Sequence, residues 1–290
     1  MMKQTDLVSV IIPTYNRSKL IKRSATSVLN QTYRNIELII VDDGSTDDTE
    51  TVVNSINDSR IIYIKQSNQG ACVARNNGIV HAKGKFIAFH DSDDVWHKDK
   101  LEKQIECIQN TQADFVFCKM AINGNSKKRL PQNFKEGFVE ESVLPLGGST
   151  QTFLANAEVF KKECFDVEMP RLQDFELLLR IHKRYSVYCM DEILVDYYVQ
   201  DTSISANQEK LLKAWKLIQL KHPDIKTKYP KSRNLIARGI LYYAFLANNK
   251  NIKSELIKMA FFYSNSLFIK SIYVLHVLSL YEYFIKLKNE

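Results

Sequence analysis

Three carboxylates stand within four residues of this sequence, at Asp91, Asp93 and Asp94. They directly follow an apolar run from Phe86 to Phe89, which is typical of a buried β-strand. Carboxylates this close repel one another, so the cluster favours either a fully solvated turn or a divalent cation as its counter-charge. At the carboxyl end of a buried strand, where open α/β sheets bind ligands, the cation is the better interpretation.

A second acidic turn has the same placement. Asp42 and Asp43 follow the apolar segment Glu37–Val41, which predicts another buried strand. A purely structural role stays open for one of these two aspartates, in a turn where Ser45 or Thr46 caps the following helix.

The elements that carry these turns alternate between strand and helix over the first 120 residues. Apolar runs predict strands at Val8–Ile12, Glu37–Val41, Arg60–Lys65, Phe86–Phe89 and Asp114–Met120. Amphipathic segments predict helices at Arg17–Gln31, from Ser45 or Thr46 to Ile56, at Gln69–Ala82 and around Leu101–Ile108. The alternation is typical of an α/β fold with a Rossmann-like, mostly parallel sheet and flanking helices. Because parallel strands end at one edge, we expect the acidic turns and the turn at Pro13–Asn16 to form one ligand site.

Residues 121–205 follow a less regular pattern. Ala121–Pro145 is polar and contains Gly and Pro, which predicts a mobile loop or lid. The elements predicted beyond it are a strand or helix start at Phe153–Ala155, a helix at Arg171–Arg184, strands at Ser186–Met190 and Leu194–Tyr198, and a loop at Gln200–Asn207.

The C-terminal part of the chain differs in charge. Residues 206–290 hold 15 basic and 5 acidic residues, a net charge of +10, whereas residues 1–205 hold 25 and 28, a net charge of −3. Helices are predicted at Glu209–Lys221, Arg233–Ala247, Ile252–Tyr263 and Ser266–Lys288. Two interpretations stay open: a helical subdomain that packs on itself and the core, or basic aromatic helices that contact an acidic membrane surface or a partner.

Composition narrows the class of protein. The five cysteines are scattered without a CxxC spacing, which favours reduced, buried thiols over a zinc site. The N-terminus lacks the apolar region of a signal peptide, and no uncharged apolar run is long enough for a spanning helix. We therefore expect a cytoplasmic protein, with peripheral contact at the inner face of a membrane as an option for the basic C-terminal region.

The ordered motifs together resemble the inverting glycosyltransferase family 2. They are Ser9–Arg17 (SVIIPTYNR), Gln31–Tyr33 (QTY), Glu37–Asp47 (ELIIVDDGSTD), Asn68–Ala71 (NQGA), Ala74–Asn76 (ARN) and Asp91–Asp94 (DSDD). The resemblance extends over residues 7–205 and implies the GT-A fold, a Rossmann-like sheet that binds a nucleotide-diphospho-sugar and a divalent metal. We therefore expect a GT-A domain at 1–205, with a nucleotide half at 1–120 and an acceptor half at 121–205, and a basic helical region at 206–290.

The resemblance also implies which residues contact the donor. They are Pro13, Thr14, Tyr15, Asn16, Asp43, Asn68, Arg75, Asp91 and Ser92. In these roles Asp43 accepts a hydrogen bond from the uracil edge, and Arg75 supplies a fixed cation to the diphosphate. An arginine that only pairs with the acidic loop is the alternative for Arg75.

The metal assignment rests on the same resemblance. Asp93, the last residue of the DxD signature, is implied as a ligand of Mn²⁺ or Mg²⁺, and Asp91 as support for the ribose or a metal-bound water. Asp94 is left with a supporting or structural role. In the role that the resemblance implies, the metal would supply positive charge to the donor phosphates and to the departing UDP.

An inverting transfer also needs a base, which the resemblance assigns to Asp174 in the segment Gln173–Arg180 (QDFELLLR). Gln173 replaces the usual Glu of the family, which puts the environment of the base in question. The alternative for Asp174 is a carboxylate favoured by a helix dipole, and Glu176 is expected to support the structure.

Two departures from the family pattern bear on function. Many relatives carry Tyr-Arg-x-His where this chain has Tyr197–Gln200 (YYVQ), so a histidine that can complete the metal sphere is missing at Gln200. The Gln-x-x-Arg-Trp element and the spanning helices of processive synthases are also absent, which predicts addition of single sugars.

The sequence thus predicts a metal-dependent hexosyl or N-acetylhexosaminyl transferase that uses a UDP-sugar and a glycan or lipid-linked acceptor in cell-surface polysaccharide synthesis. A nucleotidyltransferase would need a Gly-rich basic loop near the N-terminus, which Pro13–Asn16 is not. A non-catalytic module that binds a nucleotide-sugar or a partner is the other alternative. No nucleic-acid motif is visible, so no nucleic-acid partner is expected.

Overall fold

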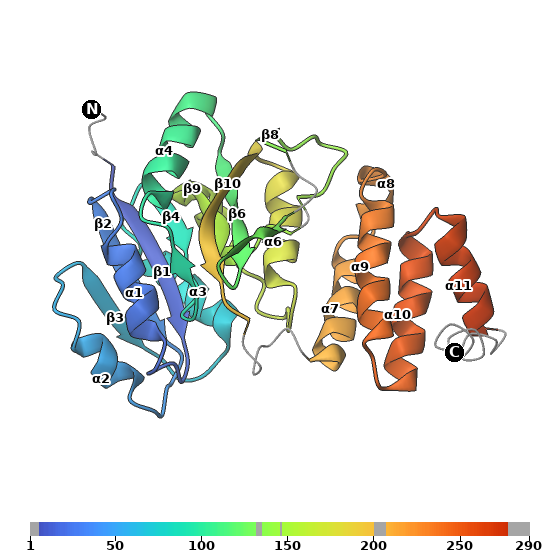
Figure 1. Ribbon diagram of the computed structural model, residues 1–290, viewed down its shortest axis with the longest axis horizontal. Helices are drawn as coiled ribbons and strands as arrows, with labels where there is room; N and C mark the ends of the chain where they lie inside the picture. Colours follow the sequence, from blue (N-terminus) through green and yellow to red (C-terminus); the bar gives the residue numbers. More distant parts are fainter. Residues whose placement is uncertain (1–5, 132–134, 146, 200–206, 278–290) are drawn as a thin grey trace. The chain divides into compact units, whose positions relative to one another are not determined.

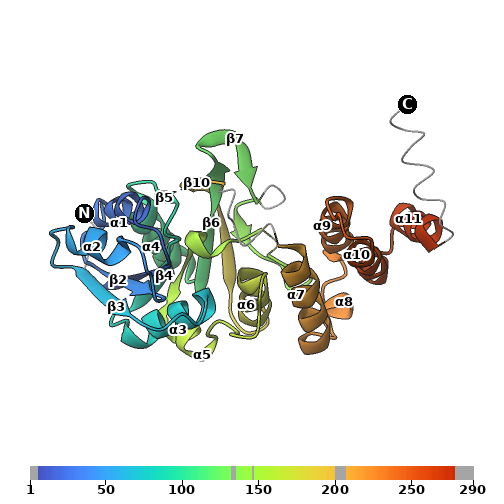
Figure 2. The same ribbon diagram turned by 90° about the horizontal axis from the view of Figure 1, so that it is seen from below.

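The computed structural model describes residues 6–131, 135–145, 147–199 and 207–277 of the chain. The chain divides into two compact units. The first comprises Met1–Val139, Pro145–Met169 and Gln173–Asp201, and the second comprises Glu140–Leu144, Pro170–Leu172 and Thr202–Glu290. Figure 1 and Figure 2 show a sheet flanked by helices in the first unit and helices alone in the second.

A parallel layer forms the N-terminal part of the sheet. Its strands, in spatial order, are β3 (Ile61–Lys65), β2 (Ile36–Asp42), β1 (Val8–Thr14) and β4 (Phe86–Phe89). The last three are buried along their whole length, as their nearly continuous apolar sequences predict. The connecting helices are α1 (Ile21–Leu29), α2 (Thr49–Asn54) and α3 (Ala71–His81). The predicted alternation of strand and helix is therefore confirmed in this part.

The remainder of the sheet is mixed. β9 (Phe153–Asn156) lies antiparallel between β4 and β6 (Phe115–Ile122), and β10 (Val187–Tyr197) runs parallel to β6. The short β5 (Val95–Trp96) is antiparallel to β10. The predicted parallel arrangement holds for β1 to β4 and for the pair β6 and β10, whereas β9 and the short strands make the sheet mixed. An order of elements along the chain does not reveal a strand that inserts between two others.

The segment Ala121–Pro145, predicted to be a loop or lid, contains strands instead. β6 continues to Ile122, turns through Asn123 (φ 51°) and Gly124 (φ 70°), and returns antiparallel as β7 (Asn125–Leu130). An Asn-Gly pair is typical of a two-residue hairpin turn, because both positions adopt the left-handed backbone that such turns require. The sequence thus held a hairpin signal that the loop prediction overlooked.

A second correction concerns β10, which is one strand from Val187 to Tyr197 where two were predicted. The polar residues Asp191 and Glu192 suggested a break, and the register against β6 does shift there. The strand nevertheless continues, and both carboxylates are paired: Asp191 forms an ion pair with Lys119, and Oε2 of Glu192 lies 2.5 Å from Nζ of Lys103. Two helices were not predicted, α5 (Ala157–Lys162) and α8 (Ile225–Lys228).

Alternate residues of the central strands face two apolar cores, one on each side of the sheet. Ile12 and Ile40 belong to one core, and Ile11 and Ile39 belong to the other. On the second side α3 lies against β1 at Gly78, where an added Cβ would be only 2.4 Å from Cγ2 of Ile11. The absence of a side chain at this position therefore allows α3 to approach the sheet closely.

The second unit contains α7 (Gln208–Lys221), α8, α9 (Arg233–Phe245), α10 (Lys250–Tyr263) and α11 (Leu267–Val277). Within it α10 packs against α7, α9 and α11. The predicted continuation of the last helix beyond residue 277 and most of the predicted loop at Gln200–Asn207 lie outside the described residues. Over the ranges given above, no helix is both long and apolar enough to cross a membrane.

One buried charge in the first unit affects stability. Lys100, the first residue of α4 (Lys100–Thr111), is fully buried. Its Nζ donates to Oε1 of Gln104 at 2.6 Å and lies 3.8 Å from the centroid of the Trp96 ring. Burial of the ammonium lowers the pKa of Lys100 to about 8.

This pKa predicts that the contribution of Lys100 to the free energy of unfolding rises between about pH 7.5 and about pH 9. In that window the unfolded chain keeps the lysine proton, with a pKa of about 10.4, whereas the folded chain loses it, so unfolding takes up a proton. Buried thiols with raised pKa values, such as Cys118 and Cys189, contribute in the opposite direction, so the effect of Lys100 is the difference between wild type and a variant without this charge. Lys100→Met removes the charge at similar volume, so the free energy of unfolding of wild type minus that of the variant should increase from about pH 7.5 to about pH 9. Urea unfolding at both pH values measures the free energy of unfolding of each protein. An identical pH dependence in wild type and Lys100→Met would contradict the prediction.

Candidate active site

The carboxyl ends of three parallel strands meet at one edge of the sheet. The register pairs Thr14 of β1 with Asp42 of β2, and Ile11 of β1 with Phe89 of β4. The backbone N–H of Asp43 donates to the carbonyl of Thr14 at 2.8 Å. The structure therefore brings together the three polar turns that the sequence placed at this edge.

The turn after β1 presents one exposed aromatic ring. Residues 13 and 14 are buried, whereas the side chain of Tyr15 is 45% exposed. Asn16 has a positive φ of 51°, accepts the N–H of Thr46 at 2.9 Å and donates its own N–H to Oγ of Ser45 at 2.8 Å. These bonds fix the turn, so the ring of Tyr15 stands at the edge of the sheet as a surface for stacking.

Asp42 has the structural role that the sequence left open for one of the two aspartates. Its carboxylate accepts the N–H of Ser45 at 2.7 Å and the hydroxyl of Tyr63 at 2.5 Å. The prediction that Ser45 or Thr46 caps the following helix is wrong, because α2 begins only at Thr49. Both residues belong to the turn.

Asp43 connects its turn to the start of α3. Its carboxylate accepts the backbone N–H of Gln69 at 2.9 Å and that of Gly70 at 2.7 Å. Asn68 lies exposed in the same loop, and its backbone N lies 3.0 Å from where a Cβ of Gly44 would be. Oδ1 of Asp43 also accepts Nε2 of Gln66 at 2.8 Å. Asp43 therefore holds the loop of Asn68 at the edge of the sheet, and its Oδ2 has capacity for a further hydrogen bond.

A single buried cation joins two distant parts of the site. Arg75 of α3 is 7% exposed and donates from Nη2 to Oδ1 of Asp91 at 2.9 Å. Its Nη1 donates to Oε1 of Gln173, the first residue of α6 (Gln173–His182), at 3.1 Å. The guanidinium also lies 5.3 Å from the centroid of the Phe165 ring. Arg75 thus makes the ion pair with the acidic loop that was its alternative role, in a buried place between β4 and α6.

The candidate base lies beside this cation. Asp174 is half-buried in the first turn of α6, and its Oδ1 accepts the N–H of the next residue at 2.8 Å. Burial raises the pKa of Asp174, the neighbouring N–H and the charge of Arg75 lower it, and the charge of Asp91 raises it. Asp174 and Asp91 therefore share one electrostatic environment. Glu176 is buried and pairs with Arg180 at 2.8 Å, as expected of a supporting residue.

The candidate metal ligand carries a negative charge that is only partly compensated. The side chain of Asp93 is 22% exposed and lies 4.0 Å from Nε of Arg17. Its backbone carbonyl accepts from Nη2 of Arg23 at 2.5 Å. Burial and the charge of Asp91 raise the pKa of Asp93, whereas Arg17 and Arg23 lower it. A cation beside Asp93 would offset this repulsion.

The residues at this edge could hold a divalent metal only if a bound substrate supplied some of its ligands. In the described part of the chain no group of three or more His, Cys, Asp or Glu side chains could hold a metal alone. Mg²⁺ is usually bound by one or two carboxylates, with water and substrate phosphates as the other ligands. Asp93 suits that kind of site.

Asp94 ties the acidic loop to the other half of the sheet. It is fully buried, and its two oxygens accept Nε2 of Gln151 and the backbone N–H of Tyr198, each at 2.9 Å. Ser92 is also buried. Gln200, the position at which many relatives carry a histidine, follows Tyr198 by two residues but lies outside the described residues.

Sequence analysis missed two of these side chains, Arg23 and Gln151. Arg23 contacts a carbonyl 70 residues away, and Gln151 contacts a carboxylate 57 residues away. Neither residue belongs to a short motif, so no local signal points to its partner.

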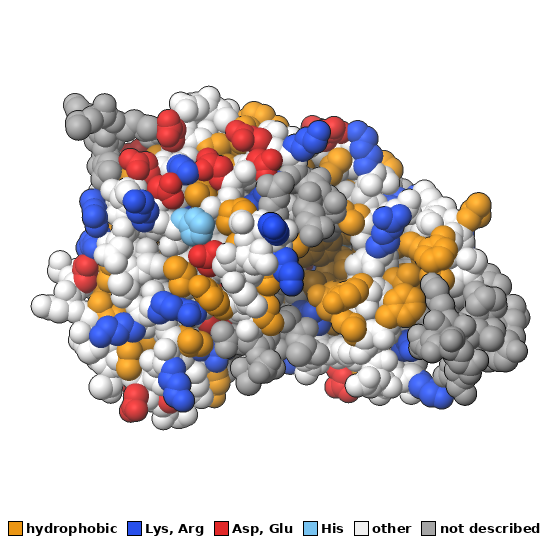
Figure 3. Space-filling view, viewed as in Figure 1, with side chains coloured by type: hydrophobic (Ala, Val, Ile, Leu, Met, Phe, Trp, Pro, Cys, Tyr) orange, Lys and Arg blue, Asp and Glu red, His pale blue; other side chains and the backbone are white. Residues whose placement is uncertain are grey.

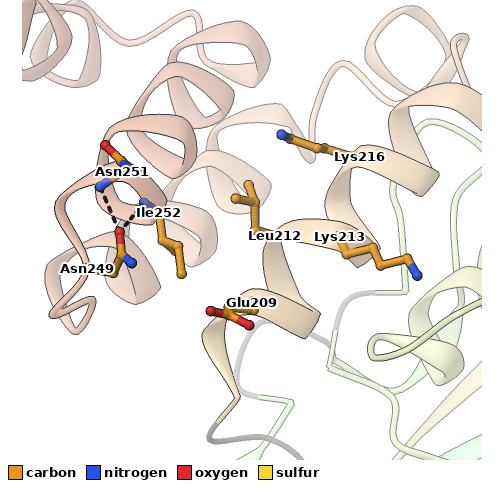
Figure 4. Close-up of a pocket in the computed structure, with 7 residues that line it drawn as sticks. All are labelled: Glu209, Leu212, Lys213, Lys216, Asn249, Asn251 and Ile252. Atoms are coloured by element: carbon orange, nitrogen blue, oxygen red, sulfur yellow. Dashed lines mark hydrogen bonds between the residues drawn. The ribbon is translucent and has the colours of Figure 1, made fainter.

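A hollow of about 270 Å³ lies in the second unit, between α7 and α10 (Figure 4). Leu212 and Ile252 line it with apolar side chains. Asn249 caps α10 by accepting the N–H of Asn251 at 2.9 Å and that of Ile252 at 3.2 Å. All its lining residues belong to the second unit, so it is no part of the site at the sheet edge.

Comparisons with known proteins agree with this architecture. Residues 9–178 match the family model described as Glycosyl transferase family 2. The Escherichia coli protein WfgD, named UDP-Glc:alpha-D-GlcNAc-diphosphoundecaprenol beta-1,3-glucosyltransferase, is 32% identical over 257 residues, which cover 82% of this chain and 96% of WfgD.

Two solved structures show the same fold. S. aureus TarS 1–349 in complex with UDP-GlcNAc has a TM-score of 0.69 at 21% identity, covering 87% of this chain and 79% of TarS. The mannosyltransferase PcManGT from Pyrobaculum calidifontis, in complex with GDP-Man and Mn²⁺, has a TM-score of 0.60 at 18% identity, covering 96% and 84%. With the family model and WfgD, they confirm the GT-A architecture that the motifs predicted. The chain belongs to glycosyltransferase family 2.

Proposed function

We propose that this chain transfers one hexosyl or N-acetylhexosaminyl group from a UDP-sugar to a hydroxyl of a glycan or lipid-linked acceptor, with inversion. The observation that carries the proposal is the bridge made by Arg75, 2.9 Å from Asp91 and 3.1 Å from Gln173. It links the end of β4 to the helix that carries the candidate base in its first turn. The names of WfgD and of the TarS complex contain UDP-sugars, and the acceptor in the name of WfgD is lipid-linked, which supports a role in cell-surface polysaccharide synthesis.

In this proposal residues 1–120 bind the donor and residues 121–205 select the acceptor. The turn at 13–16 receives the nucleoside with Tyr15. Asp43 faces the nucleobase from the turn after β2, and Asn68 faces it from the loop before α3. Asp91 and Ser92 contact the ribose. Arg75 offers a fixed positive charge to the diphosphate, because its guanidinium is held in place by two oxygens.

Asp174 acts as the general base. Its carboxylate removes the proton of the acceptor hydroxyl as that oxygen attacks the anomeric carbon, and UDP leaves from the opposite face with the bonding electron pair. Half-burial favours the protonated form of Asp174, and the charge of Arg75 favours the ionised form. Burial therefore strengthens the uptake of the acceptor's proton by Asp174. The charge of Arg75 keeps the carboxylate ionised, and so able to accept that proton, near neutral pH.

Asp93 would hold Mn²⁺ or Mg²⁺ together with the donor phosphates. A metal at this position supplies positive charge to the departing diphosphate. The Mn²⁺ in the PcManGT complex supports the choice of ion.

Asp174→Asn should lower turnover by roughly 10²–10⁴-fold, because the amide cannot take up the proton. UDP affinity, measured by calorimetry, should stay within about twofold of wild type. UDP release from UDP-glucose with a GlcNAc-diphosphate lipid reports turnover. Glu158→Gln, which removes an exposed carboxylate from α5, is the control. Wild-type turnover in Asp174→Asn would exclude Asp174 as the general base.

Asp93→Asn should remove the effect of Mn²⁺ on both binding and turnover. UDP binding without metal should persist, whereas the gain in UDP affinity on adding Mn²⁺ should disappear, and turnover should fall by roughly 10²–10³-fold. Calorimetry with and without Mn²⁺ separates these effects. If Mn²⁺ strengthens UDP binding to the variant as it does to wild type, the metal assignment is wrong.

The second unit has the features of a membrane-contacting surface. Its described residues 207–277 hold 13 basic and 3 acidic residues. Figure 3 shows hydrophobic side chains gathered over the helices of this unit, with Lys and Arg beside them. Leu267 and Phe268 are 83% and 71% exposed, and Nζ of Lys226 lies 4.4 Å from the centroid of the Phe262 ring. We therefore propose peripheral contact of this unit with an anionic membrane surface, where lipid-linked acceptors reside.

Replacing both Leu267 and Phe268 with Ser should weaken binding to phosphatidylglycerol vesicles at least about tenfold, because two side chains that enter the lipid interface are lost. Cosedimentation measures binding. Val80→Ser, an equally exposed apolar side chain on α3 of the first unit, is the control and should bind as wild type does. Equal binding of the double variant and wild type would contradict this surface.

A further inference from the structure

Gln173 connects the candidate base to the buried cation. Its Oε1 accepts from Nη1 of Arg75 at 3.1 Å, and its Nε2 donates to the carbonyl of Met169 at 3.2 Å. Both ends of the amide are therefore engaged. The side chain holds Arg75 in place without adding a charge next to Asp174.

In the described part of the chain, several ionisable groups act on Asp174 or on its neighbour Cys72. They are Arg75 on α3, Asp91 after β4, Asp166 before α6 and Glu176 on α6. Burial raises the pKa of the Cys72 thiol to about 12, so this group carries no charge at neutral pH.

The negative charges among these groups are unequally compensated. Glu176 is neutralised by its ion pair with Arg180 at 2.8 Å, and Asp166 is only partly buried. Asp91 pairs directly with the guanidinium of Arg75, and the charge of Arg75 also acts on Asp174. A carboxylate at position 173 would make three such groups around one cation.

We propose that Gln173 is a positioning residue that sets how readily Asp174 takes up and loses its proton, because it anchors Arg75 with a neutral oxygen. The inference rests on the proposed role of Asp174 as the base. It assigns a function to the amide itself, since a glutamate of the same shape would hold Arg75 equally well but would compete for its charge.

Gln173→Glu tests the proposal. The titration midpoint of Asp174 should rise by about one pH unit, because one negative charge is added a few ångströms away in a partly buried site. The ¹³C carboxyl resonance of Asp174, identified by its loss in Asp174→Asn, reports the midpoint without any substrate. The acid limb of the kcat/KM profile for UDP-glucose should move by the same amount.

Two control variants separate charge from shape. Gln109→Glu adds the same charge on the exposed face of α4 and should leave the midpoint unchanged. Gln173→Leu removes the anchor without adding charge, so turnover should fall and the midpoint should rise by less than in Gln173→Glu, because Arg75 keeps its bond to Asp91. If Gln173 were purely structural, both substitutions at position 173 would lower turnover equally and neither would shift the pH profile.

Arg75→Gln provides a second route if Gln173→Glu does not fold. Loss of the cation should also raise the Asp174 midpoint, and an unchanged midpoint in either variant overturns the proposal. A different result would show that the proposed function, and not the role of Gln173, is wrong. If the midpoint rises in Gln173→Glu but Asp174→Asn keeps wild-type turnover, Asp174 is not the base, although Gln173 still controls its protonation.

Discussion

The site depends on one buried guanidinium. Arg75 is bonded to Asp91 after β4 and to Gln173 at the start of α6, so it joins two segments that the sheet alone would not bring into contact. Burying a charge is costly unless the charge is paired and hydrogen-bonded. Because both bonds must form together, the acidic loop and the helix of Asp174 are held in one arrangement.

The packing of α3 makes this arrangement available. Gly78 lets the helix lie against Ile11 of β1, and the carboxylate of Asp43 binds the N–H groups of Gln69 and Gly70 at the start of the helix. Arg75 lies between these two constraints. The same contacts that hold the loop of Asn68 thus also direct the guanidinium of Arg75 toward the acidic turn.

The acidic side chains at the edge of the sheet are compensated to different degrees by basic side chains and by hydrogen bonds. Arg17 and Arg23 approach Asp93, while Asp94 is removed from solvent and used to bind Gln151 and Tyr198. The three neighbouring carboxylates consequently have three environments. One pairs with Arg75, one is left partly compensated beside two arginines, and one holds the two halves of the sheet together.

Local sequence was sufficient for much of the fold. Strands β1, β2 and β4 are continuous apolar runs that stop at polar turns, so their positions and their shared carboxyl edge could be predicted. The acidic motifs identified the family, and the family model confirms it. The hairpin at Asn123 and Gly124 was also encoded locally, although its signal was overlooked.

Other features exist only in the folded chain. β9 inserts between β4 and β6, and this places Gln151 against Asp94, a contact across 57 residues. Arg75 reaches Gln173 across 98 residues, and no spacing or periodicity relates two such positions. The sequence therefore determined which carboxylates lie at the edge of the sheet. Only tertiary packing decided which of them would be paired, buried or left for a ligand, because charge compensation depends on distances between segments that are remote along the chain.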